Sequence, residues 1–263
     1  MNAASEGPFG ILLDIDGVLY VGDEPIEGAH AALGELRELG AGVRLVTNTT
    51  SRSRREVCEH LQQLGFEVTV EEVLTPAAMA LRHCEERGYR AVELIVSDGL
   101  REDLAQFDRS AGGEPVDAVI LGDVGKRFDA ELLNRVFRLL MDGAELVALQ
   151  HNRYWRRADG LALDVGAYAA ALEYATRREA AVVGKPAEAF FQAAIVDMGL
   201  NDAVMVGDDV EADVEGAMAA GLPGILVRTG KYRQDALPPE VTPTAIVDSI
   251  ADVPGLLARI LPG

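Results

Sequence analysis

Apolar and polar positions along the chain follow two alternating patterns. Short runs rich in β-branched residues predict buried strands, and stretches with apolar residues three or four positions apart predict amphipathic helices. The expected strands are Phe9–Leu13, Val43–Thr47, Val92–Val96, Ala118–Leu121, Leu146–Leu149, Ala181–Val183, Val204–Val206 and Gly224–Val227. The expected helices are Gly28–Leu39, Arg52–Leu64, Pro76–Arg87, Ala130–Met141, Tyr168–Thr176, Glu188–Met198, Ala212–Ala219 and Ser249–Ile260. This alternation is typical of an α/β fold with a mostly parallel sheet.

Length and composition favour two globular domains. The chain has 263 residues, of which 49% are hydrophobic, and this length is near the point where one core tends to divide. No apolar run approaches the roughly 20 residues of a membrane span, and the N-terminus has no signal-peptide pattern. We therefore expect a soluble, cytoplasmic protein.

The charge of the chain excludes some partners. A formal net charge of -19 argues against nucleic acid and against an anionic membrane surface. The lysines are only Lys126, Lys185 and Lys231, so a lysine at a motif is informative. Cys58 and Cys84 lie in separate predicted helices without metal-binding spacing, and we expect both to be reduced packing residues.

Polar clusters follow several predicted strands, where ligands bind in open α/β sheets. Asp14 and Asp16 follow the first strand in the sequence DIDG. Carboxylates two positions apart in extended chain project to the same side, and Gly17 then permits a sharp turn. The first could attack as a nucleophile, and the second could act as a general acid and base. An Asp-rich turn without catalytic function is the alternative.

A hydroxyl and an amide end the second strand. Thr47 and Asn48 stand before the following helix, where their donors would face a phosphoryl group. Ser51 and Ser53, by contrast, are predicted to cap that helix.

Lys185 lies between a glycine and a proline after a short Val-Val strand. Turn chemistry explains Gly184 and Pro186, but it does not explain a lysine in a chain with so few. Its ammonium could offset charge on a carboxylate and on phosphoryl oxygens.

Further carboxylates follow the strand Val204–Val206. Asp208 and Asp209 begin the next helix and Asp213 comes about one turn later. Their hard oxygen atoms suit Mg²⁺, although acidic residues are also favourable at any helix start. Because a phosphate dianion beside several carboxylates would be repelled, both the cation and Lys185 are expected to be required.

These motifs, in this order, resemble the haloacid dehalogenase superfamily: DIDG, VTNTT, GKP and GDDVEAD. The resemblance implies a Rossmann-like catalytic core, residues 1–75 and 180–263, with an inserted α/β cap of class IIA (NagD-like) at residues 76–179. It implies Asp14 as nucleophile, Asp16 as acid and base, phosphate contacts from Thr47, Asn48 and Lys185, and Mg²⁺ on Asp14, Asp16 and Asp208. Asp209 and Asp213 would support the metal site or Lys185. Caps of this class often form homodimers.

One segment departs from the family pattern. Many class IIA caps carry Asn-x-Asp here, but the residue two positions after Asn152 is Tyr154. Tyr154, Trp155 and Arg156 could form a specificity loop with Asn152, or a strand-turn-strand that simply exposes its arginines.

The sequence therefore predicts a Mg²⁺-dependent phosphatase that acts on small phosphorylated metabolites or pyrophosphate. A phosphotransferase or phosphomutase would use the same intermediate, and a non-catalytic phospho-ligand sensor could use the same scaffold. A phospho-accepting receiver domain also clusters Asp, Thr and Lys, but it lacks a cap.

Overall fold

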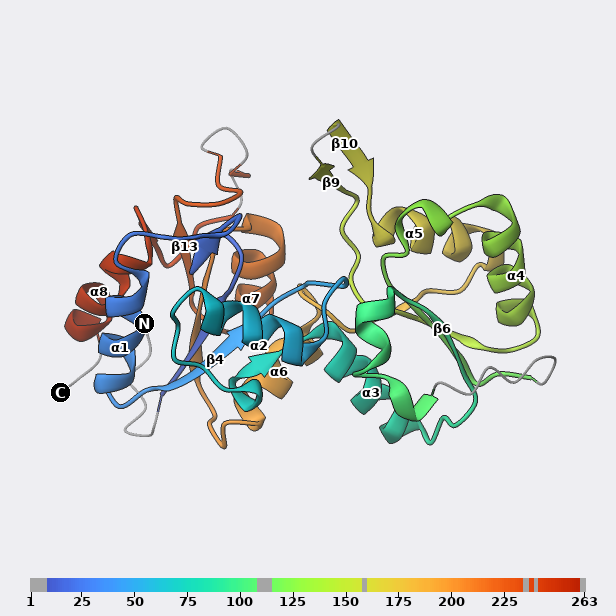
Figure 1. The fold of residues 1–263 in the computed structure, drawn as a ribbon, viewed down its shortest axis with the longest axis horizontal. Coiled ribbons are helices and arrows are strands. Elements are labelled where there is room, and N and C mark those ends of the chain that lie inside the picture. Colours follow the sequence, from blue (N-terminus) through green and yellow to red (C-terminus); the bar gives the residue numbers. More distant parts are fainter. Residues whose placement is uncertain (1–8, 108–114, 158–159, 234–236, 239–240, 261–263) are drawn as a thin grey trace. The chain divides into compact units, whose positions relative to one another are not determined.

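The computed structural model describes residues 9–107, 115–157, 160–233, 237–238 and 241–260 (Figure 1). The chain divides into two compact units. The first comprises Met1–Thr47, Cys58–Leu74 and Lys185–Gly263, and the second comprises Asn48–Val57 and Thr75–Gly184. The predicted boundaries differ mainly in that they leave the segment Asn48–Val57 with the first unit.

The first unit is built on a parallel six-stranded sheet in the order β14-β13-β12-β1-β4-β5. The central strand β1 (Gly10–Asp14) pairs with β12 (Ala203–Gly207) and β4 (Gly42–Val46). The outer strands are β13 (Gly224–Val227), β14 (Ala245–Val247) and β5 (Val73–Leu74). All five β1 residues are buried, as expected of a central strand covered on both faces.

Helices cover both faces of this sheet. α1 (Ala29–Glu38) packs beside α8 (Val253–Ile260), and α6 (Glu188–Val196) packs beside α7 (Gly216–Ala219) on the other side (Figure 1). A short hairpin, β2 (Tyr20–Val21) and β3 (Glu24–Pro25), follows β1. One further helix, α2 (Arg54–Gln63), crosses the boundary between the units.

The second unit has its own parallel sheet in the order β11-β8-β7-β6. Its strands are β6 (Val92–Ile95), β7 (Ala118–Leu121), β8 (Glu145–Ala148) and β11 (Ala181–Val182). The helices are α3 (Pro76–Arg87), α4 (Ala130–Met141) and α5 (Val165–Thr176). An antiparallel hairpin, β9 (Tyr154–Arg157) and β10 (Gly160–Leu163), precedes α5 (Figure 1).

Short 3₁₀ segments supplement these elements: Val70–Glu72, Asp98–Arg101, Ala105–Phe107, Gly125–Arg127 and Ile250–Asp252. The fold class is as predicted. Each of the expected strands agrees with an observed strand to within one residue, whereas β2, β3, β5 and β14 were not predicted. The helix expected at Ala212–Ala219 instead begins as a π-helical segment, Val210–Glu215. The helix expected to start at Tyr168 starts at Val165, because Asp164 caps it by accepting from the Val165 N–H.

No helix in the described ranges combines the length and apolarity needed to cross a membrane. The cytoplasmic location stays a prediction, as do the catalytic and cap roles of the two units.

Candidate active site

Asp14 is the last residue of the central strand, so its side chain stands at the carboxyl end of the sheet. The side chain is buried, and its Oδ1 accepts a hydrogen bond from Lys185 Nζ at 2.6 Å. Lys185 begins the return of the chain from the second unit, 171 residues later. The structure thus brings together two residues that the sequence had linked only through their chemistry.

Lys185 is held by two carboxylates rather than one. Its Nζ also donates to Asp213 Oδ1 at 2.6 Å, and its side chain is only 2% exposed. Burial by itself would lower the pKa of Lys185, but the negative charges of Asp14 and Asp213 outweigh it and raise the pKa above its ordinary value. The group is therefore a fixed positive charge at the end of β1.

Asp208 completes a buried acidic cluster. Oxygen atoms of Asp14, Asp208 and Asp213 lie within 4.8 Å of one another. Burial, followed by the charges of Asp14 and Asp213, raises the pKa of Asp208 to about 8. Burial and Asp14 also raise the pKa of Asp213, against the opposing effect of Lys185. Both shifts come first from burial and then from neighbouring negative charge, so a bound cation would favour the ionised carboxylates.

A hard cation fits this cluster. Asp208 Oδ1 is buried and has no hydrogen-bond partner within the described part of the chain, a costly state for a carboxylate oxygen unless a further group binds it. When Asp14, Asp208, Asp209 and Asp213 are all ionised, their four negative charges exceed the two positive charges of Lys185 and Lys231, which leaves a formal charge of -2. A divalent ion with oxygen ligands would balance that charge.

Asp16 lies in the turn after β1, and its side chain is exposed. Gly17 adopts φ +87°, which an L side chain rarely tolerates, and its N–H donates to the Tyr20 carbonyl at 2.8 Å.

Thr47 directly follows β4 and is buried, and its backbone N–H donates to the Leu74 carbonyl at 3.2 Å. Asn48 is the first residue of the second unit, so its role at the phosphate stays a prediction.

Asp209 supports the site from the helix start. Its Oδ1 accepts from the N–H groups of Glu211 and Ala212, and its Oδ2 accepts from Lys231 Nζ at 3.1 Å. Lys231 also donates its backbone N–H to Asp208 Oδ2 at 2.6 Å. Sequence reasoning assigned no role to Lys231, although the rarity of lysine in this chain was a usable signal.

The residues predicted for specificity lie at the hairpin of the second unit. Tyr154 and Trp155 are 56% and 41% exposed on β9, and the Asn152 N–H donates to Gln150 Oε1. The Arg156 backbone belongs to β9, but its side chain lies outside what the structure describes. β9 and β10 pair as the two antiparallel strands that this alternative expects, whereas its exposed arginines and the contact with substrate stay predictions.

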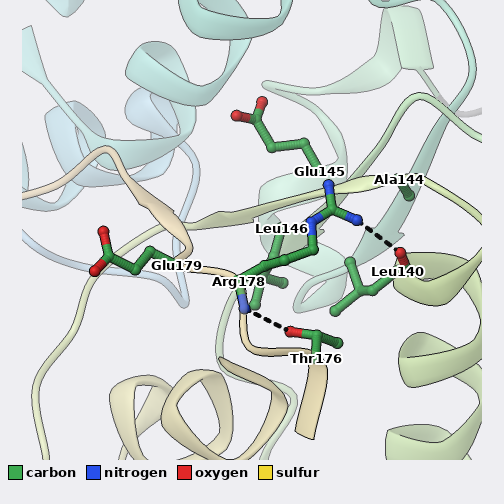
Figure 2. A pocket seen from close by; sticks show the side chains of 7 residues that line it. All are labelled: Leu140, Ala144, Glu145, Leu146, Thr176, Arg178 and Glu179. Carbon is green, nitrogen blue, oxygen red and sulfur yellow. Dashed lines mark hydrogen bonds between the residues drawn. The ribbon is translucent and has the colours of Figure 1, made fainter. Parts of the chain in front are cut away.

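A separate hollow in the second unit has a volume of about 80 Å³ (Figure 2). Arg178 crosses it and donates to the Leu140 carbonyl at 2.8 Å and, through its backbone N–H, to Thr176 Oγ1 at 3.3 Å. Glu145 is paired with His83 at 2.9 Å. The hollow is far smaller than the roughly 300 Å³ of a typical ligand site, and Glu145, Thr176 and Arg178 already have partners.

Comparison with known proteins identifies the family of this chain. A haloacid dehalogenase-like hydrolase model matches residues 11–109, and a HAD-hydrolase-like model matches residues 182–253. The chain therefore belongs to the haloacid dehalogenase superfamily, as its motifs predicted, and it is an enzyme of the hydrolase class.

Among its relatives, haloacid dehalogenase-like hydrolase domain-containing protein 2 of Rattus norvegicus is 43% identical over 85% of each chain. Phospholysine phosphohistidine inorganic pyrophosphate phosphatase of Bos taurus is 40% identical over 96% of this chain and 95% of that one. The sequence pattern predicted a resemblance to both of these proteins.

Solved structures share the fold of this chain. The p-nitrophenyl phosphatase of Archaeoglobus fulgidus superposes with a TM-score of 0.85 and 28% identity, covering 95% of this chain and 99% of that one. Glycerol phosphate phosphatase of Mycobacterium tuberculosis, solved in complex with magnesium, has a TM-score of 0.77 and 31% identity, covering 91% of this chain and 74% of the other.

Proposed function

We propose that this HAD-type phosphatase is Mg²⁺-dependent and hydrolyses small phosphomonoesters or pyrophosphate through a phosphoryl group carried on Asp14. The observation that carries the proposal is the buried cluster in which Lys185 contacts both Asp14 and Asp213 at 2.6 Å beside Asp208. It combines a candidate nucleophile, a fixed ammonium and a hard-cation site. Relatives named for nitrophenyl phosphate, glycerol phosphate and pyrophosphate support small substrates.

In the first step, an Asp14 carboxylate oxygen forms a bond to phosphorus as the bond to the leaving oxygen breaks. Asp16 donates its proton to that leaving oxygen. Lys185 stays charged and bound to Asp14 Oδ1, so it offsets the negative charge that gathers as the phosphoryl group approaches. Thr47 and Asn48 would donate to the phosphoryl oxygens.

In the second step, the Asp16 carboxylate removes a proton from a water molecule that attacks phosphorus. The bond between phosphorus and the Asp14 oxygen then breaks, which releases phosphate and restores both side chains. The exposure of Asp16 suits this role, because the group can reach both leaving group and solvent. Mg²⁺, held by Asp14, Asp208 and the Asp16 carbonyl, would neutralise charge on the phosphoryl oxygens.

A phosphate-release screen tests this function. The panel should include pyrophosphate, phosphosugars, nucleotides, pyridoxal phosphate, phosphohistidine and an aryl phosphate, each with Mg²⁺ and with EDTA. We expect release with Mg²⁺, loss of release in EDTA, and recovery when Mg²⁺ is returned in excess. Product analysis with added alcohol acceptors distinguishes hydrolysis from phosphotransfer. Ligand binding without release from any member of the panel would favour the sensor instead.

The raised pKa of Asp208 predicts how metal binding depends on pH. Without metal, folded Asp208 keeps a proton up to about pH 8, whereas the unfolded chain loses it near the ordinary pKa of about 4. Because the folded state binds more protons in this window, the contribution to stability is lost as the pH rises through about 8.

Mg²⁺ binds the deprotonated carboxylate, so its stabilising effect has the opposite trend. At one fixed Mg²⁺ concentration, we expect the rise in Tm over the EDTA sample to be larger at pH 8 than at pH 6. Differential scanning fluorimetry measures both values. In Asp208→Asn, the Mg²⁺-induced rise in Tm should be similar at pH 6 and pH 8. An equal rise in Tm at both pH values in wild type would refute the prediction.

A further inference from the structure

The turn Thr229–Lys231, which follows β13, contacts two parts of the proposed cation site: Asp208 and the turn that follows Asp14. Lys231 donates its backbone N–H to Asp208 Oδ2 at 2.6 Å. Thr229 donates its hydroxyl to the carbonyl of Gly17, in the turn that carries Asp16. One short segment therefore holds the Asp208 carboxylate and the Asp14–Gly17 loop at the same time.

This arrangement leaves the two oxygens of Asp208 in different states. Oδ2 is occupied by the Lys231 N–H, while Oδ1 is buried and has no hydrogen-bond partner among the described residues. One carboxylate oxygen each of Asp14, Asp208 and Asp213 lies within 4.8 Å of the others. The hydrogen bond from Lys231 occupies Asp208 Oδ2, so Oδ1 is the Asp208 oxygen left without a partner among the described residues.

Glycine at position 230 makes this contact possible. Gly230 has φ +64°, and a methyl group there would collide with Asp208 Oδ2 and come within 2.6 Å of the Gly17 Cα. The space at Gly17 is equally restricted, because a methyl group added there would collide with the same Asp208 oxygen. The two glycines therefore let two backbone segments close around one carboxylate.

The Lys231 side chain anchors the turn from the other side. Its Nζ bonds Asp209 Oδ2 at 3.1 Å, and Asp209 in turn accepts from the first N–H groups of the helical segment Val210–Glu215. The Lys231 side chain is 62% exposed, and its positive charge acts on Asp208 from a distance. The group of Lys231 that donates a hydrogen bond to Asp208 is its backbone N–H, which the turn holds in place.

We propose that the Thr229–Lys231 turn is a positioning element for the metal, which orients Asp208 Oδ1 and locks the Asp14–Gly17 loop against it. The inference rests on the proposed function, because it concerns the same cation site. The proposed mechanism assigns no substrate contact to Thr229, Gly230 or Lys231.

The test is the affinity for Mg²⁺ itself, measured by isothermal titration calorimetry on the whole protein. Gly230→Ala should weaken Mg²⁺ binding by roughly 10- to 100-fold, the range typical when groups that orient metal ligands are lost. Gly221→Ala is the matched control: Gly221 has φ +84° but no atom within 4 Å of an added methyl, so it carries the same backbone strain without the collision. It should bind Mg²⁺ like wild type.

Lys231→Met gives a second and independent result. If Lys231 acted only as a nearby positive charge, its removal would reduce repulsion and strengthen Mg²⁺ binding. The positioning role predicts weaker binding, partly recovered in Lys231→Arg, with Lys126→Met unchanged. The metal-free Tm of each variant reports its folding separately.

Equal affinity of Gly230→Ala and Gly221→Ala, or tighter binding by Lys231→Met, would overturn the inference while leaving the proposed function intact. Failure of wild type to bind Mg²⁺ at all would remove both.

Discussion

Replacing Asp14 by Asn should lower kcat by at least about 10⁴-fold, as loss of a nucleophile does in enzymes with covalent intermediates. An amide oxygen cannot form the acyl phosphate, and the partial charge it offers Lys185 is far weaker than a carboxylate. The folded structure should survive, because Lys185 keeps its second partner, Asp213, at 2.6 Å.

The control for this variant is Asp23→Asn in the same unit. The Asp23 side chain is 89% exposed, so the change in charge is identical but distant from the buried cluster. Steady-state phosphate release should be within about twofold of wild type, since surface substitutions rarely matter. Retention of more than about a tenth of wild-type kcat by Asp14→Asn would be incompatible with an Asp14 nucleophile.

Lys185→Met should have the largest effect on stability. The substitution removes the one ammonium that contacts both Asp14 and Asp213, and it leaves these carboxylates buried at 8% and 1% side-chain exposure. Breaking a buried ion pair in this way costs about 3–5 kcal/mol. Turnover should fall by roughly 10²- to 10³-fold as well, because a preorganised charge beside the phosphoryl group is lost.

Urea unfolding in EDTA measures the stability effect without interference from the metal. Lys126→Met provides the comparison, because Lys126 is an exposed lysine of the second unit and its loss should change the unfolding free energy by less than about 0.5 kcal/mol. An unfolding free energy for Lys185→Met equal to that of Lys126→Met would mean that the buried network contributes nothing to folding.

The main features of the fold could be predicted from sequence because the physical signals are local. Strands such as Ala118–Leu121 are continuous apolar runs, and α3 begins at a proline after Thr75, which caps it by accepting from Ala78. The two-residue strands β2, β3 and β5 and the three-residue strand β14 were missed, because runs this short carry no periodicity of their own.

The acidic cluster was also predictable, since Asp14 ends β1 and Asp208 directly follows β12 of the same parallel sheet. The contact between Lys185 and Asp213 was predicted only as one of two alternatives, because Asp213 was expected to support either the metal site or Lys185. The turn at Thr229–Lys231 was not predicted to have a role, because its hydrogen bonds reach Gly17 and Asp208, 212 and 23 positions away. No local pattern in the sequence encodes contacts of that kind.

The most direct test of the account is to trap the phosphoryl group on Asp14. In Asp16→Asn, an aryl phosphate still has a good leaving group, so the first step should proceed while the second lacks its base. Rapid mixing should give a burst of phenolate close to one equivalent per enzyme. Mass spectrometry of the acid-quenched protein should then locate one phosphoryl group on the peptide that contains Asp14. A linear time course without a burst, together with an unmodified Asp14 peptide, would contradict the covalent mechanism.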